Sequence, residues 1–179
     1  VIALPMNCLP DVEWSPPLHP RVLEAGRAGH TGRGLKVIAR VTGGAEHKQL
    51  GLGGPQCPLN IAFTYARDSS ESLFVGFGSD ARALDGNDRG AVERALRLFF
   101  PALQVQECLS HDWVADPFSS GTWANYRTGW LANYQPHFQQ DRGRIVFGQG
   151  DHGEGWRGFI DGAIGAGAKA AHRVRALLG

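Results

Sequence analysis

The sequence lacks the features that mark membrane-spanning, nucleic-acid-binding and disulfide-stabilised proteins. Its 179 residues include no apolar run of the ~18 residues typical of a membrane-spanning helix. Eighteen Lys and Arg balance seventeen Asp and Glu, and a net charge of +1 does not favour nucleic acid or an anionic membrane. The three cysteines are an odd number at wide spacing. They predict buried, reduced thiols in a cytoplasmic protein, rather than a disulfide framework or a zinc site.

Two further absences concern domain organisation. The 25 Gly and 10 Pro are spread along the chain, and neither a linker nor an internal repeat divides it, which favours one domain or a domain with part of another. The sequence begins VIALP, without an initiator Met or a signal peptide. We therefore expect a fragment that starts within a strand.

Hydrophobic patterning predicts a mixture of strands and helices. Strands or strand ends are predicted at 1–4, 35–41, 60–66, 73–79, 105–113 and 144–147. Helices are predicted at 19–28, 88–100 and 156–178. The mixture is typical of an α/β or α+β fold, and the pattern alone does not decide between the two.

The predicted helix at 156–178 has the clearest pattern. Gly158, Gly162 and Ala166 lie four residues apart and leave a groove poor in side chains, where a backbone or a flat ligand could approach. Close packing against a sheet is the plainer interpretation, because an apolar stripe recurs at helical spacing: Trp156, Phe159, Ile160, Ala163, Ile164, Gly167, Ala171, Val174 and Leu178.

A glycine-rich turn, GQGDHG at 148–153, joins the predicted strand at 144–147 to this helix. It matches the pattern G-x-G-x-x-G of dinucleotide-binding proteins. A Rossmann unit would need a second parallel strand after the helix, with an acid that binds ribose, and none follows. A glycine loop at a helix N-terminus still suits an anion. The pattern leaves open a cofactor contact or a plain tight turn.

Four sequence blocks together resemble the monoamine-oxidase family of flavin-dependent amine oxidases. They occur in the family's order: VIALPMNCL at 1–9 with EWSPPL at 13–18, GLKV at 34–37, DPFSSGTW at 116–123, and GQGD at 148–151 followed by GWRGFIDGAI at 155–164. The last block is similar to that of bacterial members, including some that act on nicotine-like amines.

The resemblance implies an organisation for the whole chain. It covers the C-terminal portion of an FAD-linked oxidase with an α/β (α+β) fold. Residues 1–10 would be the strand end and crossover from the FAD-binding domain, 11–115 a partial substrate-binding domain, and 116–179 the C-terminal FAD-binding segment. The family's N-terminal Rossmann motif is not in this sequence.

The resemblance also implies roles for three candidate catalytic residues. Lys36 matches a lysine that holds a water near flavin N5. Trp123 and Phe159 match two side chains that face each other before the flavin as an aromatic cage. Without the resemblance, Lys36 reads as an exposed lysine at a strand start, and the two aromatics read as core residues.

Five more residues match positions around the cofactor. Gly150, Asp151, Trp156 and Gly158 match positions near the flavin and its ribityl–diphosphate chain. Asp151 stands where many members have glutamate. Thr122 falls where members with covalent flavin have cysteine, so the resemblance implies non-covalent FAD.

The implied reaction is hydride transfer from an amine to flavin N5, giving an imine that water converts to an aldehyde or ketone. The implied partners are a small-molecule amine and O2, which is reduced to H2O2, with a helix N-terminus at Trp156 stabilising the reduced ring. There are two alternatives. The enzyme could be an amino-acid oxidase of the same fold, or the chain could be an inactive piece that needs the N-terminal half or a homodimer partner. A metal site at Asp151, His152 and Glu154 lacks ligand spacing, and Ser110-His111-Asp112 lacks the G-x-S-x-G elbow of a hydrolase.

Overall fold

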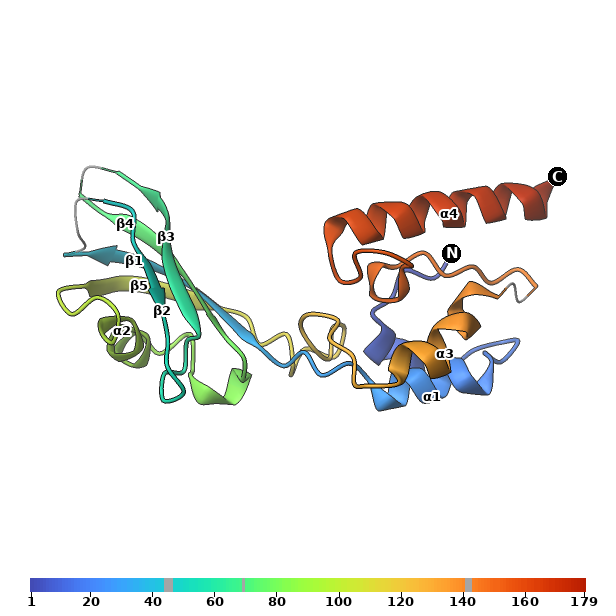
Figure 1. Ribbon diagram of the computed structural model, residues 1–179, viewed down its shortest axis with the longest axis horizontal. Coiled ribbons are helices and arrows are strands. Elements are labelled where there is room, and N and C mark those ends of the chain that lie inside the picture. Colours follow the sequence, from blue (N-terminus) through green and yellow to red (C-terminus); the bar gives the residue numbers. More distant parts are fainter. Residues whose placement is uncertain (44–46, 69, 141–142) are drawn as a thin grey trace. The chain divides into compact units, whose positions relative to one another are not determined.

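The structure is a computed structural model that describes residues 1–43, 47–68, 70–140 and 143–179. The chain forms two compact units (Figure 1). Unit 1 combines Val1–Gly32 with Ala115–Gly179, and unit 2 is Arg33–Val114. Each unit is described separately.

Unit 2 is built on an antiparallel five-stranded sheet with strand order β2-β3-β4-β1-β5 (Figure 1). Its strands are β1 Leu35–Thr42, β2 Leu50–Leu52, β3 Ile61–Arg67, β4 Ser72–Gly78 and β5 Gln104–Ser110. Four of the five were predicted, although β5 ends three residues before the predicted 113. β2 was not predicted because three residues containing a glycine give no periodic signal.

One face of this sheet carries the core of unit 2. Alternate residues of β1 point inward, so that Val37, Ala39 and Val41 are buried. Helix α2, Arg89–Arg97, packs against the sheet through Val92, Ala95 and Leu96, as its helical spacing predicted. A short 3-10 turn, η2 at Ala81–Ala83, follows β4.

Unit 1 is mainly helical. Its elements are η1 Met6–Asp11, α1 Pro20–Ala28, α3 Trp130–Gln139, η3 Gly150–His152 and α4 Ile160–Leu178. Helix α1 was predicted, with Pro20 at its first position and Gly29 beyond its end. Helix α3 was missed because Pro136 lies inside it and disguises the pattern. Residues of η1, α1 and α3 form one apolar cluster.

The predicted strands at 1–4 and 144–147 prove to be a single parallel bridge between Ile2 and Phe147. Two hydrogen bonds hold it: the Ile2 N–H donates to Val146 O at 2.7 Å, and the Gly148 N–H donates to Ile2 O at 2.9 Å. Helix α4 lies close over this segment. A Cβ at Gly148 would stand 3.0 Å from the Cβ of Ala170, so the glycine permits the close approach.

The prediction for the last helix needs two corrections. The helix begins at Ile160 rather than Trp156, because Trp156 and Gly158 adopt positive φ values of 46° and 75°. The apolar stripe is also largely exposed, with Ile160 and Ile164 at 81% and 67%. Within the described part of unit 1, the segment packed against α4 forms isolated bridging and no multi-stranded sheet, so nothing in that unit covers the stripe.

Within the described ranges, every helix is too short or too polar to cross a membrane.

Candidate functional site

The turn between the parallel bridge and α4 holds five of the predicted site residues. Gly150 is buried, and a Cβ there would stand 3.2 Å from the Cβ of Ala163 on α4. The Gly158 N–H donates back to Gly150 O at 3.2 Å. Residues 150–158 therefore form a closed loop in front of the first turn of α4.

Asp151 is a buried member of this loop, and its carboxylate points into unit 1. Its Oδ2 accepts a hydrogen bond from the Met6 N–H at 3.1 Å, at the start of η1. The Tyr126 hydroxyl donates to the backbone O of Asp151. Asp151 thus anchors the loop to η1. The Tyr126 hydroxyl is partly buried, and this burial is the main reason that its pKa is raised.

Trp156 and Phe159 lie together at the mouth of the loop. Their rings meet edge to face, with centroids 5.9 Å apart and planes at 86°. Both side chains are exposed, at 70% and 64%. Phe159 is the N-cap of α4 and has no acceptor atom, so its side chain leaves the first-turn N–H groups of the helix available.

The segment carrying Thr122 and Trp123 approaches this loop. A Cβ on Gly158 would stand 3.3 Å from the Cβ of Ala124. The Thr122 N–H donates to Gly32 O at 2.9 Å. Trp123 itself is 45% exposed. Hence Ala124, which directly follows the predicted residues Thr122 and Trp123, meets Gly158, which directly precedes Phe159, within unit 1.

Asn7 supports this segment, and sequence reasoning did not single it out. Its Nδ2 donates to Ser120 O at 2.9 Å, and its Oδ1 accepts from the His30 N–H at 3.0 Å. One side-chain amide therefore ties the crossover at 1–9 to the segment at 116–123. Both blocks carried the family resemblance, but no local signal indicated that they touch.

Lys36 belongs to unit 2, whereas the other predicted site residues belong to unit 1. It is exposed on β1, and its Nζ lies 5.7 Å from the centroid of the Phe77 ring on β4. Its backbone O accepts from the Ser110 hydroxyl at 2.8 Å. The aromatic face gives the ammonium group a favourable neighbour.

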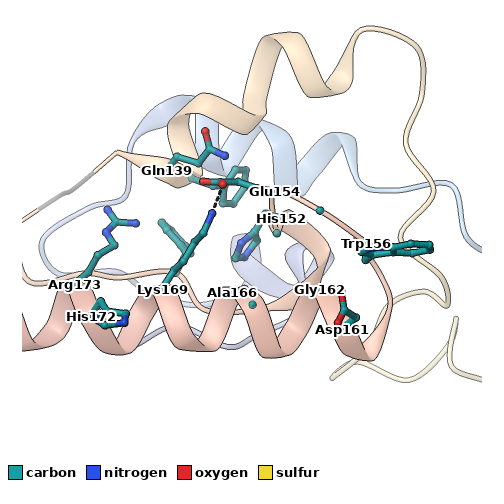
Figure 2. Close-up of a pocket in the computed structure, with 15 residues that line it drawn as sticks. Gln139, His152, Glu154, Trp156, Asp161, Gly162, Ala166, Lys169, His172 and Arg173 are labelled. Carbon is teal, nitrogen blue, oxygen red and sulfur yellow. Dashed lines mark hydrogen bonds and ion pairs between the residues drawn. The ribbon is translucent and has the colours of Figure 1, made fainter.

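A cavity of about 710 Å³ lies between α4 and the loop (Figure 2). Lys169 of α4 reaches across it to form an ion pair with Glu154 of the loop. His152 lines its floor, with a ring stacked at 4.7 Å on Phe138 and edge-to-face at 5.4 Å with Phe147. Burial lowers the pKa of His152 to about 4, so the ring is neutral near pH 7.

The site is suited to a flat, partly anionic cofactor. Glycines at 150 and 158 remove side-chain bulk, the start of α4 offers N–H groups, and two aromatic rings stand at the opening. A helix N-terminus stabilises negative charge. In the described part of the chain, no cluster of three or more His, Cys, Asp or Glu could hold a metal ion.

Comparison with known proteins identifies the family of the chain. The family model described as flavin containing amine oxidoreductase matches residues 1–175. The chain is 36% identical over 180 residues to pseudooxynicotine dehydrogenase from a Pseudomonas species, covering 99% of this chain and 36% of that protein. It is 32% identical over 169 residues to (S)-6-hydroxynicotine oxidase from Paenarthrobacter nicotinovorans, covering 92% and 38%. The chain thus spans little more than a third of these relatives.

Solved structures share the fold at lower identity. Putrescine oxidase bound to putrescine matches 97% of this chain with a TM-score of 0.78 and 20% identity. Cyclohexylamine oxidase from Brevibacterium oxydans matches 99% with a TM-score of 0.76 and 20% identity. In both cases the match covers 42% of the solved chain.

Proposed function

This chain belongs to the flavin-containing amine oxidoreductase family, and we propose that it forms the closing part of the FAD site of an enzyme that oxidises a small-molecule amine. The observation that carries the proposal is the contact of Ala124 with Gly158, which brings the segments 122–124 and 158–159 together beside the glycine loop. These segments place exposed aromatic rings next to the start of α4, whose first-turn N–H groups have no side-chain cap, an arrangement that can face a planar cofactor and its substrate.

Bound FAD would supply the redox chemistry, accepting hydride from the carbon next to the amine nitrogen, and O2 would reoxidise it with formation of H2O2. The residues of this chain would bind the cofactor and orient the substrate. Gly150 and Gly158 would let the cofactor approach the backbone, and the N-terminus of α4 at Ile160 would stabilise negative charge. Trp123 and Phe159 would align the substrate, and Lys36 would hold a water.

We propose that the FAD is non-covalent, because Thr122 has no thiol. Trp156 would border the flavin, while Asp151 would act through the backbone it anchors, since its carboxylate is bonded to Met6. We assign 1–10 and 116–179 to the FAD-binding part and 11–115 to the substrate-binding part.

The relatives guide the choice of substrate. Pseudooxynicotine and 6-hydroxynicotine appear in the names of the two relatives described above, and a third relative, from Pseudomonas putida, is named nicotine dehydrogenase. We propose that this chain's enzyme acts on an amine of that nicotine-like class. Two of these relatives are called dehydrogenases and one an oxidase, so a test of the electron acceptor should compare O2 with a soluble carrier.

The exposed stripe of α4 supports completion of the site by further protein. Ile160 and Ile164 lie on the first two turns of α4, which also border the candidate site. Large exposed apolar patches commonly mark contact surfaces. We propose that the N-terminal half of the family fold covers this stripe, in preference to a homodimer partner. A cytoplasmic location remains a proposal, based on the thiols of Cys8, Cys57 and Cys108.

Flavin titration tests the proposal. The visible absorption of FAD should shift on addition of a protein that joins this chain to an N-terminal half of the family. The 179-residue chain alone should bind FAD much more weakly. Failure of the joined protein to bind FAD would refute the proposed cofactor, and equal binding by the chain alone would refute the need for a second half.

A further inference from the structure

Gln135 is a buried side chain of α3 whose amide makes three hydrogen bonds with the loop at 150–158. Its Nε2 donates to His152 O and Gly153 O, each at 3.1 Å. Its Oε1 accepts from Arg157 Nε at 2.8 Å. Carbonyl oxygens only accept and a guanidinium only donates, so this orientation of the amide is the one that chemistry allows.

Arg157 extends the connection to the other side of the loop. Its Nη2 donates to Glu154 O at 3.2 Å, while its Nε donates to Gln135 Oε1. The two side chains therefore hold three backbone carbonyls, those of His152, Gly153 and Glu154. We call this pair, Gln135 with Arg157, the carbonyl clamp.

The carbonyl clamp encloses the strained part of the loop. Trp156 has a φ of 46°, an unusual value for a bulky residue, and it directly precedes Arg157. The backbone O of Trp156 accepts from the Phe159 N–H at 3.1 Å. Release of Arg157 would therefore free the backbone on both sides of Trp156, and the paired rings of Trp156 and Phe159 would lose their fixed position.

We propose that Gln135 and Arg157 are positioning residues that hold Trp156 and Phe159 in the orientation from which they face the flavin. This inference rests on the proposed function, and it adds a support from a helix that contacts the loop but carries none of the predicted site residues. Neither residue needs to touch the cofactor for the effect.

Amide hydrogen exchange of the full chain tests the clamp without any cofactor. Gln135→Met keeps the side-chain length but removes the donor and acceptor, and Arg157→Met removes the guanidinium. Each variant should speed exchange of the Gly158 and Phe159 N–H groups by at least about tenfold, which corresponds to about 1.4 kcal/mol. Asn133→Leu, at an exposed position on the same helix outside the cavity lining, should leave both rates unchanged.

Two more variants separate a clamp from general loosening. The double variant should speed exchange at Gly158 by less than the product of the two single effects, because the bond between Gln135 and Arg157 is lost in each single variant. Gln135→Glu keeps one oxygen that can accept from Arg157, but it places a second oxygen, which cannot donate, against the carbonyl oxygens of His152 and Gly153. It should therefore behave like Gln135→Met near neutral pH. Additive effects of the two single variants, or unchanged exchange in Gln135→Met, would overturn the inference.

The flavin readout links the clamp to the site. In the protein joined to its N-terminal half, Gln135→Met should change the visible circular dichroism of bound FAD and slow its reduction by amine about tenfold. Asn133→Leu should do neither. An unaltered flavin spectrum and reduction rate in Gln135→Met would overturn the positioning role, whereas absence of FAD from the unsubstituted protein would refute the proposed function instead.

Discussion

Gly158 lies against Ala124: a Cβ on the glycine would stand 3.3 Å from the Cβ of the alanine. This contact joins the loop before α4 to the segment that carries Trp123. Because Gly158 also has a φ of 75°, both the space and the backbone conformation favour glycine at this position. Trp123 directly precedes Ala124, and Phe159 directly follows Gly158. The contact between Ala124 and Gly158 therefore governs how the proposed aromatic pair is placed.

Substitution of Gly158 should therefore destabilise unit 1. We expect Gly158→Ala to lower the free energy of unfolding by about 1–2 kcal/mol, the cost of a left-handed conformation for a residue with a Cβ. Urea unfolding measures the change. Gly167→Ala is the matched control, since a Cβ there meets nothing within 4 Å and the residue lies within α4. It should raise stability by roughly 0.5–1 kcal/mol, and equal effects of the two variants would contradict the account.

His152 should make stability depend on pH. Its folded-state pKa of about 4 lies below the ordinary value of 6.5. Between these values the unfolded chain binds a proton that the folded chain does not, so stability is full above pH 6.5 and falls as the pH drops toward 4. The shift corresponds to a loss of ~3 kcal/mol across the window.

Unfolding measurements across this pH range, on the chain and on His152→Phe, check the prediction. Phenylalanine keeps a ring to stack on Phe138 but cannot titrate. The variant should lose most of the pH dependence between 6.5 and 4. A variant profile as steep as that of the parent chain would assign the acid sensitivity to other groups.

Loss of the Asp151 carboxylate should weaken the anchor between the loop and η1. Asp151→Ala leaves the buried Met6 N–H without its acceptor, which should cost about 1–3 kcal/mol of unfolding free energy. Asp151→Asn retains an acceptor oxygen and should cost less. Glu13→Ala, at an exposed position, serves as the control in the same denaturation series. An alanine variant as stable as this control would show that the bond to Met6 contributes nothing.

Local patterns predicted much of unit 2 and little of the arrangement of unit 1. The alternation in β1 and the helical spacing of Val92, Ala95 and Leu96 carry their own burial pattern, so those elements were found. The hydrogen bond between Asp151 and Met6, and the carbonyl clamp of Gln135 with Arg157, depend on contacts between segments that are separated in the sequence. Such contacts leave no periodic signal.

The stripe of α4 shows why a correct pattern gave a wrong packing prediction. Its spacing correctly indicated a helix with one apolar face, but Ile164 is exposed because no multi-stranded sheet packs against α4 within the described part of unit 1. The start of the helix was misplaced for a different reason: backbone conformation at Trp156 is set by the loop, and the apolar spacing continues through it. Roles for Lys36, Trp123 and Phe159 remain predictions.

Trp123 should affect chemistry more than cofactor binding. In the FAD-loaded protein, Trp123→Ala should slow flavin reduction by amine on the order of tenfold to hundredfold, through lost substrate alignment. The Kd for FAD should change much less. Stopped-flow reduction and flavin titration measure the two quantities. The reverse result, weak FAD binding with normal reduction, would mean that Trp123 mainly packs the fold.

Anaerobic reduction of the flavin tests the central claim most directly. The protein that joins this chain to the N-terminal half of the family would be loaded with FAD and mixed with nicotine-like amines in the absence of O2. The account predicts that the yellow absorption of the flavin bleaches with at least one of these amines and returns on admission of an electron acceptor. Tightly bound FAD that no amine of this class reduces would contradict it.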